Sequence, residues 1–200
     1  MTPAPPSLFE LNVPPGFRYH RAFLSDTEEA ALAAAIATIK FSTFEMRGVV
    51  ARRRVAFFGE SYAGAEAAPV PPFLLGLRAS LAAWANLEPA ALAMALINEY
   101  RPGTPIGWHR DAPQYELVAG VSLLSSCRMK LRPYRASTSL ASRSGPRRAT
   151  HQIMLERRSA YLLTGESRND YEHHIPAVEA FRYSVTFRTL RQQLPRADHL

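Results

Sequence analysis

The sequence holds a single cysteine, Cys127, in 200 residues. One thiol excludes an intrachain disulfide and a cysteine-based zinc cluster, so Cys127 is expected to be a small buried residue. No apolar run reaches the roughly eighteen residues that a membrane-spanning helix needs, so no membrane partner is expected. The first residues, MTPAPPSLFELNVPPG, lack the charged start and apolar block of a secretory signal, which makes the cytoplasm the default location.

Acidic residues are also scarce, with 17 Asp and Glu against 24 Lys and Arg and a formal net charge of +7. A basic surface attracts polyanions because Lys and Arg that neutralise phosphates release counterions, although the same charge can simply keep a surface solvated. The basic residues gather in three runs: Arg52, Arg53 and Arg54; Arg143 to Arg148; Arg157 and Arg158.

The length and the 47% hydrophobic content predict one globular domain, which we expect to be a monomer. A cap residue, early acids and abundant alanine predict a helix that begins at Ser25 or Asp26, and leucine spacing predicts another over 72–87. Residues 41–59 are typical of a hairpin, and the chain after Pro89 breaks into short strands separated by turns. The pattern indicates an α+β fold in which helices flank a β sandwich or barrel. We expect a flexible N-terminal arm over 1–16, one domain over 17–191, a polar loop over 137–149 and a tail over 192–200.

His109-Arg110-Asp111 is the first chemical motif. In an extended chain, residues two apart point to the same face, so one imidazole and one carboxylate aim at a single point. Two histidines and one carboxylate form the facial triad of non-haem iron(II) oxygenases. A tripeptide of this kind also arises by chance as a surface pair, so it needs a distant histidine as its partner.

Four histidines follow the motif and are candidates for that partner. Adjacent histidines in a strand point to opposite faces, so at most one of the neighbouring pair can be an inward ligand. The candidates are His151, His173, His174 and His199.

The last expected strand alternates apolar and polar residues. Its polar face has arginines at both ends, Arg182 and Arg188, whose long side chains can lean together onto a short dicarboxylate. The alternative is an exposed edge strand with solvated arginines. The apolar set is Phe181, Tyr183, Val185 and Phe187, and the polar set is Arg182, Ser184, Thr186 and Arg188.

Four motifs resemble, in order and spacing, those of the AlkB family of iron(II)/2-oxoglutarate-dependent dioxygenases. They are INEYRPGTPIGWHRD, GVSLLSSCRMKLR, LLTGESRNDYEHHIPAV and RYSVTFR, over about residues 94–191. The resemblance implies a double-stranded β-helix (jelly roll) core with N-terminal flanking helices. It also implies iron(II), 2-oxoglutarate and molecular oxygen, and oxidative dealkylation of nucleic-acid bases as the activity.

Carried over to this chain, the resemblance assigns His109, Asp111 and His173 as iron ligands, the last because His-x-x-Pro fits His173 to Pro176. It gives the two arginines to 2-oxoglutarate, with Arg182 at the far carboxylate and Arg188 near the iron. Two residues of the Asn-x-Tyr strand, Asn98 and Tyr100, are assigned to the same cosubstrate.

The substrate is the least determined part of the assignment. Family members that repair nucleic acids carry an acidic residue two positions after the aspartate, and this chain has Pro113 there. Aromatic residues next to cations suit the stacking of alkylated single-stranded DNA or RNA bases. One alternative is an oxygenase of the same fold that acts on a protein or small molecule, and another is a catalytically silent nucleic-acid-binding module. The candidate substrate residues are Phe57, Phe58, Tyr62, Arg52, Arg53, Arg54 and Trp108.

Overall fold

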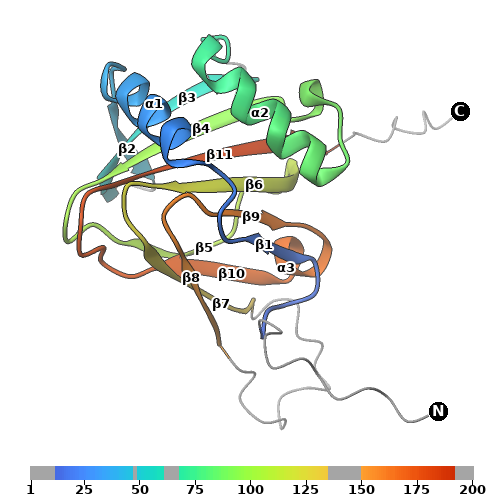
Figure 1. The fold of residues 1–200 in the computed structure, drawn as a ribbon. Helices are drawn as coiled ribbons and strands as arrows, with labels where there is room; N and C mark the ends of the chain where they lie inside the picture. Colours follow the sequence, from blue (N-terminus) through green and yellow to red (C-terminus); the bar gives the residue numbers. More distant parts are fainter. Residues whose placement is uncertain (1–11, 47–48, 61–67, 135–149, 192–200) are drawn as a thin grey trace, which may run out of the picture.

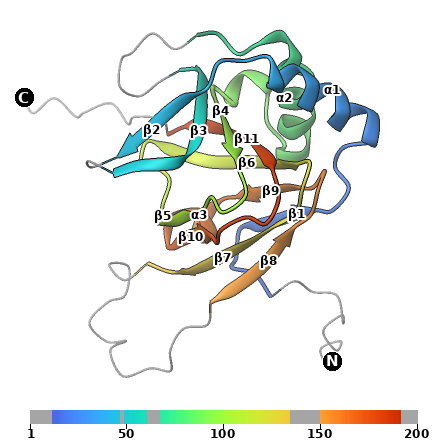
Figure 2. The same cartoon turned by 90° about the vertical axis from the view of Figure 1, so that its left-hand side faces the viewer.

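The computed structural model of the protein describes residues 12–46, 49–60, 68–134 and 150–191. Two antiparallel sheets face each other, and the helices α1 and α2 cover the outer face of the larger sheet (Figures 1 and 2). Helices, larger sheet and smaller sheet therefore form three successive layers. This is the jelly roll with flanking N-terminal helices that the sequence predicted, so the expected α+β fold class is confirmed.

The elements follow one another along the chain as expected from the many short β segments. The larger sheet has the order β1-β9-β6-β11-β4-β3-β2 and the smaller sheet the order β5-β10-β7-β8. The strands of the larger sheet are β1 (Phe17–His20), β2 (Ser42–Met46), β3 (Val49–Gly59), β4 (Met94–Tyr100), β6 (Tyr115–Leu123), β9 (Ala160–Leu163) and β11 (Arg182–Leu190). Those of the smaller sheet are β5 (Ile106–His109), β7 (Cys127–Pro133), β8 (His151–Leu155) and β10 (Tyr171–Ile175). The helices are α1 (Asp26–Ala37), α2 (Pro72–Ala85) and α3 (Gly165–Asn169), with a short 3-10 turn, η1 (Pro89–Ala91).

Both long helices begin where their sequences predict. Ser25 caps α1 with a reciprocal capping box: its hydroxyl accepts from the Glu28 N–H at 3.2 Å, and the Glu28 carboxylate accepts from the Ser25 N–H at 2.8 Å. Pro72 is the first residue of α2, where its missing N–H costs no helical hydrogen bond. This helix ends at Ala85 and is capped by Asn86, whose φ of 58° lies in the left-handed region that asparagine tolerates.

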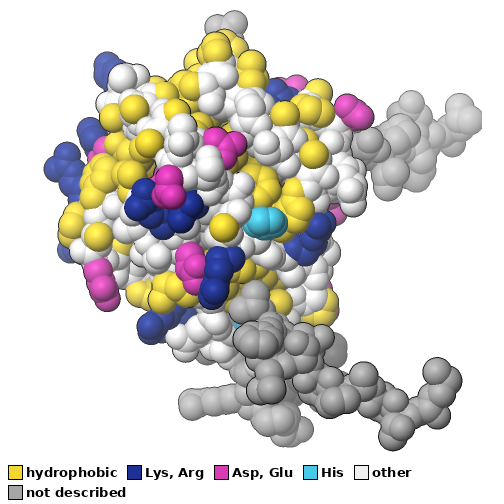
Figure 3. All heavy atoms as spheres, viewed as in Figure 1, with side chains coloured by type: hydrophobic (Ala, Val, Ile, Leu, Met, Phe, Trp, Pro, Cys, Tyr) yellow, Lys and Arg dark blue, Asp and Glu magenta, His cyan; other side chains and the backbone are white. Residues whose placement is uncertain are grey.

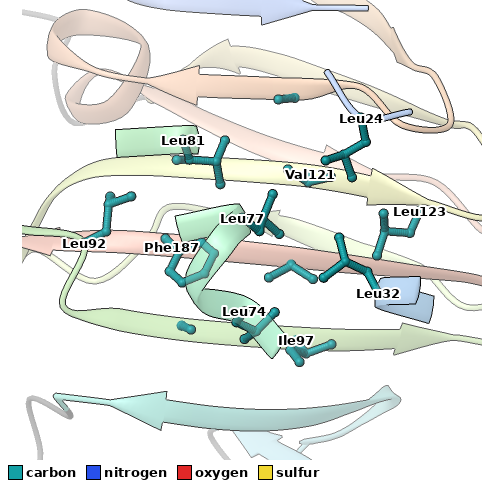
Figure 4. Packing of buried hydrophobic residues seen from close by; sticks show 14 of the residues in the cluster. Leu24, Leu32, Leu74, Leu77, Leu81, Leu92, Ile97, Val121, Leu123 and Phe187 are labelled. Carbon is teal, nitrogen blue, oxygen red and sulfur yellow. The ribbon is translucent and has the colours of Figure 1, made fainter. Parts of the chain in front are cut away.

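The main core lies between the two long helices and the larger sheet (Figure 4). Leu74, Leu77 and Leu81 of α2 point towards the sheet, as their helical spacing predicts, and each buried side chain of this size contributes about 1.5–3 kcal/mol. Strand β11 contributes Phe187 to the same core. The helical residues in this layer are Leu32, Leu74, Leu77 and Leu81, and the sheet residues facing them include Ile97, Val121, Leu123 and Phe187.

Cys127 is a buried free cysteine at the start of β7, as its isolation in the sequence predicted. Burial raises the pKa of its thiol. In the part of the chain that the structure describes, no helix is long and apolar enough to cross a membrane. Residues 1–11, the tail from 192 and the whole loop over 137–149 lie outside the described ranges, so the expected arm, tail and loop stay predictions.

Glu29 ties the helical layer to the sheet. It is completely buried in α1, accepts a hydrogen bond of 2.7 Å from the backbone N–H of Leu124, and pairs with Arg157. Replacing Glu29 with alanine leaves that N–H without its acceptor and Arg157 without its buried partner, so we expect the free energy of unfolding to fall by about 3 kcal/mol. Urea denaturation measures the loss. Glu28→Ala, which removes only an exposed cap, should cost about 1 kcal/mol, and an equal loss in the two variants would contradict this role of Glu29.

Candidate active site

A cavity of about 920 Å³ lies between the two sheets. Its lining includes residues of β3, β4, β6, β9 and β11 of the larger sheet, of all four strands of the smaller one, and of α3. Such a volume is in the range of sites that enclose a small molecule. The cavity therefore brings together residues that are far apart in the sequence.

Strand β11 forms the middle of the cavity floor. It pairs with β6 on one side and β4 on the other, so it is a central strand and not the exposed edge strand of the alternative interpretation. Its alternation is the predicted one: polar residues line the cavity and apolar ones enter the helical core. Phe181 is the exception in the apolar set, since it precedes the strand and is 38% exposed.

The two histidines predicted as ligands face each other across neighbouring strands. His109 on β5 is the register partner of His173 on β10, and their ring centroids are 4.2 Å apart. Asp111 lies two residues beyond the end of β5, and its Oδ2 is 3.8 Å from His173 Nε2. One imidazole–carboxylate pair and a distant imidazole thus meet at one wall of the cavity.

The protonation states of these three groups suit metal binding. Burial lowers the pKa of His109, and burial together with the nearby His109 lowers the pKa of His173 to about 3. Burial alone would raise the pKa of Asp111, but the charge and the hydrogen bond of the Arg188 guanidinium hold it well below its ordinary value. Neutral imidazoles and an ionised carboxylate are the forms that ligate metal ions.

The donor set fits iron(II) in its chemistry. His109 Nδ1 donates to the Gly107 carbonyl at 2.9 Å, which leaves Nε2 free to ligate, as is usual for metal-binding histidines. As the side chains stand, no three His, Cys, Asp or Glu groups within the described ranges are arranged to hold a metal ion. Asp111 Oδ1 is instead bonded to Arg188, through Nε at 2.8 Å and Nη2 at 2.6 Å. Binding iron therefore requires these side chains to close around it.

The two arginines at the ends of β11 lean towards each other. Arg182 Nη2 donates to Ser122 Oγ at 3.0 Å, and Arg188 Nη1 donates to Thr186 Oγ1 at 3.0 Å. Arg182 is fully buried, and its Nε and Nη1 have no hydrogen-bond partner. Buried guanidinium donors without an acceptor are costly, and a carboxylate of 2-oxoglutarate would satisfy them. The two unpaired nitrogens of Arg182 therefore make this end of β11 suitable for binding 2-oxoglutarate.

Asn98 and Tyr100 lie on β4 beside these arginines. Tyr100 is the register partner of Arg182, whose guanidinium carbon lies 4.7 Å from the centre of the Tyr100 ring. Asn98 Nδ2 lies 3.4 Å from Ser184 Oγ, and Asn98 Oδ1 accepts from Arg53 Nε at 3.1 Å. Both side chains line the cavity at the place where the resemblance puts the cosubstrate.

His174 occupies a different environment from its neighbour. It is half-buried, stacks on Trp108 with ring centroids 5.1 Å apart, and its Nδ1 donates to the Ile106 carbonyl at 2.7 Å. His151 is engaged elsewhere, with Nδ1 donating to the Asn12 carbonyl, and His199 lies outside the described residues. Of the described histidines after Asp111, only His173 lines the cavity.

The structure separates the predicted substrate residues on β3 into two groups. Arg53 and Phe57 line the cavity, and Phe57 is 42% exposed. Phe58 instead packs against the helical core, so the geometry gives it no substrate contact. Arg54 makes a bidentate ion pair with the buried Glu99, at 2.7 Å through each of two nitrogens.

The other predicted substrate residues differ in the same way. Arg52 is exposed and absent from the cavity lining. Trp108 does belong to the lining. Tyr62 lies outside the described residues, so its role stays a prediction.

Arg168 is a site residue to which the sequence analysis gave no role. It is buried in α3, and its Nη2 donates to the carbonyls of Ala112 and Tyr115, at 2.7 and 2.8 Å. It therefore fixes the loop that follows Asp111. The Gly-Glu-Ser-Arg turn was visible in the sequence, but its contact with a loop more than fifty residues away was not.

Comparisons with known proteins agree with this geometry. A family model described as the 2OG-Fe(II) oxygenase superfamily matches residues 16–188, and the chain belongs to that superfamily. The enzyme is therefore an iron(II)- and 2-oxoglutarate-dependent oxygenase that uses molecular oxygen, which disfavours a catalytically silent module.

Two solved structures share the fold. One, described as the structure of OsALKBH1, has a TM-score of 0.63 at 14% identity and covers 88% of this chain and 99% of that chain. The other is an oxidoreductase of the 2OG-Fe(II) oxygenase family from Burkholderia pseudomallei, with a TM-score of 0.63 at 17% identity, covering 89% of this chain and 86% of that chain. At these identities the likeness concerns the fold alone.

The adjacent histidines provide a matched pair of variants. We expect His173→Ala to lose iron and 2-oxoglutarate turnover together, because it removes a buried imidazole beside Asp111. His174→Ala should keep iron, since its ring lies against Trp108. Iron content after anaerobic loading and succinate formation in a single turnover measure both effects. Retention of iron by His173→Ala with its loss from His174→Ala would reverse the assignment.

Arg182→Ala should raise the Michaelis constant for 2-oxoglutarate by about tenfold to a hundredfold, because it removes a charge-assisted contact in a buried site. Arg128→Ala is the control, since Arg128 is exposed on β7 and absent from the cavity lining. Steady-state succinate release at varied 2-oxoglutarate measures the constant. If both variants behaved like the unmodified enzyme, Arg182 would not be a cosubstrate residue.

Proposed function

We propose that this oxygenase removes alkyl groups oxidatively from bases of single-stranded DNA or RNA, in nucleic-acid repair or RNA demethylation. The observation that carries the proposal is the charge of the cavity: its lining has six arginines and only two acidic residues. Arg53, Arg110 and Arg191 remain for a substrate once Arg182 and Arg188 are assigned to the cosubstrate and Arg168 to the loop after Asp111. A site of this charge suits a substrate with a phosphate backbone. The arginines are Arg53, Arg110, Arg168, Arg182, Arg188 and Arg191, and the acids are Asp111 and Glu172.

Arginine–aromatic pairs at the cavity support the same substrate; Trp108, Arg110 and Tyr134 belong to its lining, and Arg132 lies behind Trp108 outside the lining. The guanidinium carbon of Arg110 lies 3.7 Å from the centre of the Tyr134 ring, and that of Arg132 lies 4.0 Å from the centre of the Trp108 ring. Flat guanidinium and aromatic surfaces stack on unpaired bases. A base inside a duplex is out of reach of an enclosed site, so the target base has to be unpaired or flipped.

The chain's own residues have separable roles in this reaction. His109, Asp111 and His173 would hold iron, and Arg182 and Arg188 would hold 2-oxoglutarate; when bound, the two groups supply the power to oxidise an alkyl group. Arg168 keeps the loop after Asp111 in place through two backbone carbonyls. The alkyl group leaves as an aldehyde, and the base is restored.

The surface outside the cavity gives weaker support. The face over α1, α2 and β1 shows basic and acidic side chains interspersed with hydrophobic ones (Figure 3). The net charge of +7 is therefore not spread evenly over this face, and the charge of the cavity lining says more about the substrate. A monomer in the cytoplasm remains part of the proposal.

Pro113 supports a second candidate, an oxygenase of this fold that acts on a protein or a small molecule. Pro113 belongs to the cavity lining, where it offers no side-chain acceptor to the exocyclic amine of a base. Glu172, the acidic lining residue other than Asp111, is held by Arg132 at 2.5 Å. Base recognition would therefore fall to other groups of the lining.

The decisive test is mass spectrometry of methylated single-stranded DNA and RNA oligonucleotides incubated with the enzyme, iron(II), 2-oxoglutarate and oxygen. We expect loss of the methyl group with matching release of succinate, and no loss with His173→Ala. Succinate release that only peptides or small molecules stimulate would favour the second candidate.

Neighbouring arginines on β3 test the polyanion contact. Arg53→Ala should weaken oligonucleotide binding and reduce the slope of log affinity against log salt by about 1, because Arg53 lines the cavity. Arg52→Ala should change the oligonucleotide affinity and its salt slope less, since Arg52 lies outside the lining. Fluorescence anisotropy at several salt concentrations measures both, and the Michaelis constant for 2-oxoglutarate reports any disturbance of Asn98. Equal effects of the two variants would show that the cavity does not provide the contact.

A further inference from the structure

Gly120 and Tyr161 occupy the same space on the cavity floor. They are register partners on β6 and β9. A Cβ atom added to Gly120 would lie 2.3 Å from Tyr161 Cζ and 2.6 Å from its hydroxyl oxygen, far inside contact distance. The tyrosine ring thus lies across the glycine, and glycine in a strand interior commonly marks a close approach of this kind.

The phenol is directed by its neighbours towards the region between the two arginines. Gly120 pairs on its other side with Thr186 of β11, whose hydroxyl accepts from Arg188. Ser122, two residues along β6, accepts from Arg182. The Tyr161 hydroxyl, lying over Gly120, is therefore next to the part of the floor onto which both guanidinium groups lean.

The ring is held in this position by packing. Phe17 stacks parallel to it, with centroids 6.2 Å apart and an interplanar angle of 2°. Tyr161 is only 7% exposed and belongs both to the core between the sheets and to the cavity lining. A phenylalanine would pack equally well there, so the hydroxyl is the part that needs an explanation.

The hydroxyl is a donor that lacks an acceptor. Burial raises the pKa of Tyr161 well above its ordinary value, so the phenol stays protonated. No residue within the described ranges forms a hydrogen bond with this hydroxyl, and Tyr161 belongs to the cavity lining. The phenol is therefore available to donate to a ligand bound in the cavity.

We propose that Tyr161 is a further positioning residue for 2-oxoglutarate, whose hydroxyl donates a hydrogen bond to a carboxylate of the dicarboxylate held between Arg182 and Arg188. Gly120 is the residue that allows it, because only glycine leaves room for the ring. The inference concerns the cosubstrate and does not depend on which substrate is dealkylated.

The test combines three variants and two measurements. Tyr161→Phe removes the hydroxyl and keeps the ring, and Gly120→Ala keeps the hydroxyl and displaces the ring. Tyr19→Phe is the control, because the Tyr19 hydroxyl accepts from the Glu156 N–H at 3.0 Å, and Tyr19 is absent from the cavity lining. Calorimetric titration of 2-oxoglutarate into the iron(II)-loaded protein without oxygen gives the dissociation constant. Succinate release with oxygen gives kcat and KM separately.

We expect Tyr161→Phe to raise the dissociation constant and KM about tenfold, equivalent to about 1.4 kcal/mol, with kcat changed less than about twofold. Gly120→Ala should weaken 2-oxoglutarate in the same way, and Tyr19→Phe should leave it unchanged. If Tyr161→Phe left the dissociation constant unchanged, the proposal would be overturned even if Gly120→Ala raised it, because the ring alone would then matter. If Tyr161→Phe bound 2-oxoglutarate more weakly while Gly120→Ala bound it as the unmodified enzyme does, the result would still support the hydrogen bond.

Discussion

The site depends on one strand, β11, that must be apolar on one face and cationic on the other while lying at the middle of a sheet. Tyr183, Val185 and Phe187 pack under the helices, and Arg182 and Arg188 are buried on the opposite face. Taking guanidinium groups out of water is unfavourable unless anions meet them. Asp111 meets Arg188, and Arg182 keeps two unpaired nitrogens. The cationic face of β11 therefore stabilises Asp111 through Arg188, and its other arginine, Arg182, still requires an acidic ligand to pair with its free nitrogens.

Much of this could be predicted from the sequence because it depends on local periodicity. The alternation in β11 follows from the repeat of two residues and the leucine face of α2 from the repeat of 3.6, while the starts of α1 and α2 follow from the residue types Ser25, Glu28 and Pro72. Asp111 lies beyond the end of β5, so the strand repeat alone does not place it beside His109. The distance between His109 and His173 depends on the pairing of β5 with β10, which the resemblance supplied and periodicity did not. Contacts across strands from distant segments, such as Tyr161 on Gly120, have no local signature.

The run Arg52-Arg53-Arg54 shows the same limit more sharply. The sequence presents it as a single basic run beside aromatic residues, yet of these three arginines only Arg53 lines the cavity. Arg54 pairs with Glu99, a residue 45 positions away, and that partner could not be identified before the neighbouring strand was known. Arg157 and Arg158 likewise pair with Asp26 at the start of α1. Positive charge in this chain is therefore partly structural, and a count of basic residues overstates the surface available to a polyanion.

The two halves of the site belong to different sheets. The histidines stand on β5 and β10 of the smaller sheet, whereas both arginines stand on β11 of the larger one. Ligands that bind only the folded chain add their binding free energy to its stability. A metal held by the smaller sheet and a cosubstrate held by the larger one, bound to each other, would link the two sheets. The enzyme with both ligands should therefore resist separation of its sheets more than the ligand-free enzyme does. Amide hydrogens of β5 and β10 would then exchange with solvent more slowly once both are bound, and cellular supply of 2-oxoglutarate would influence the lifetime of the protein as well as its turnover.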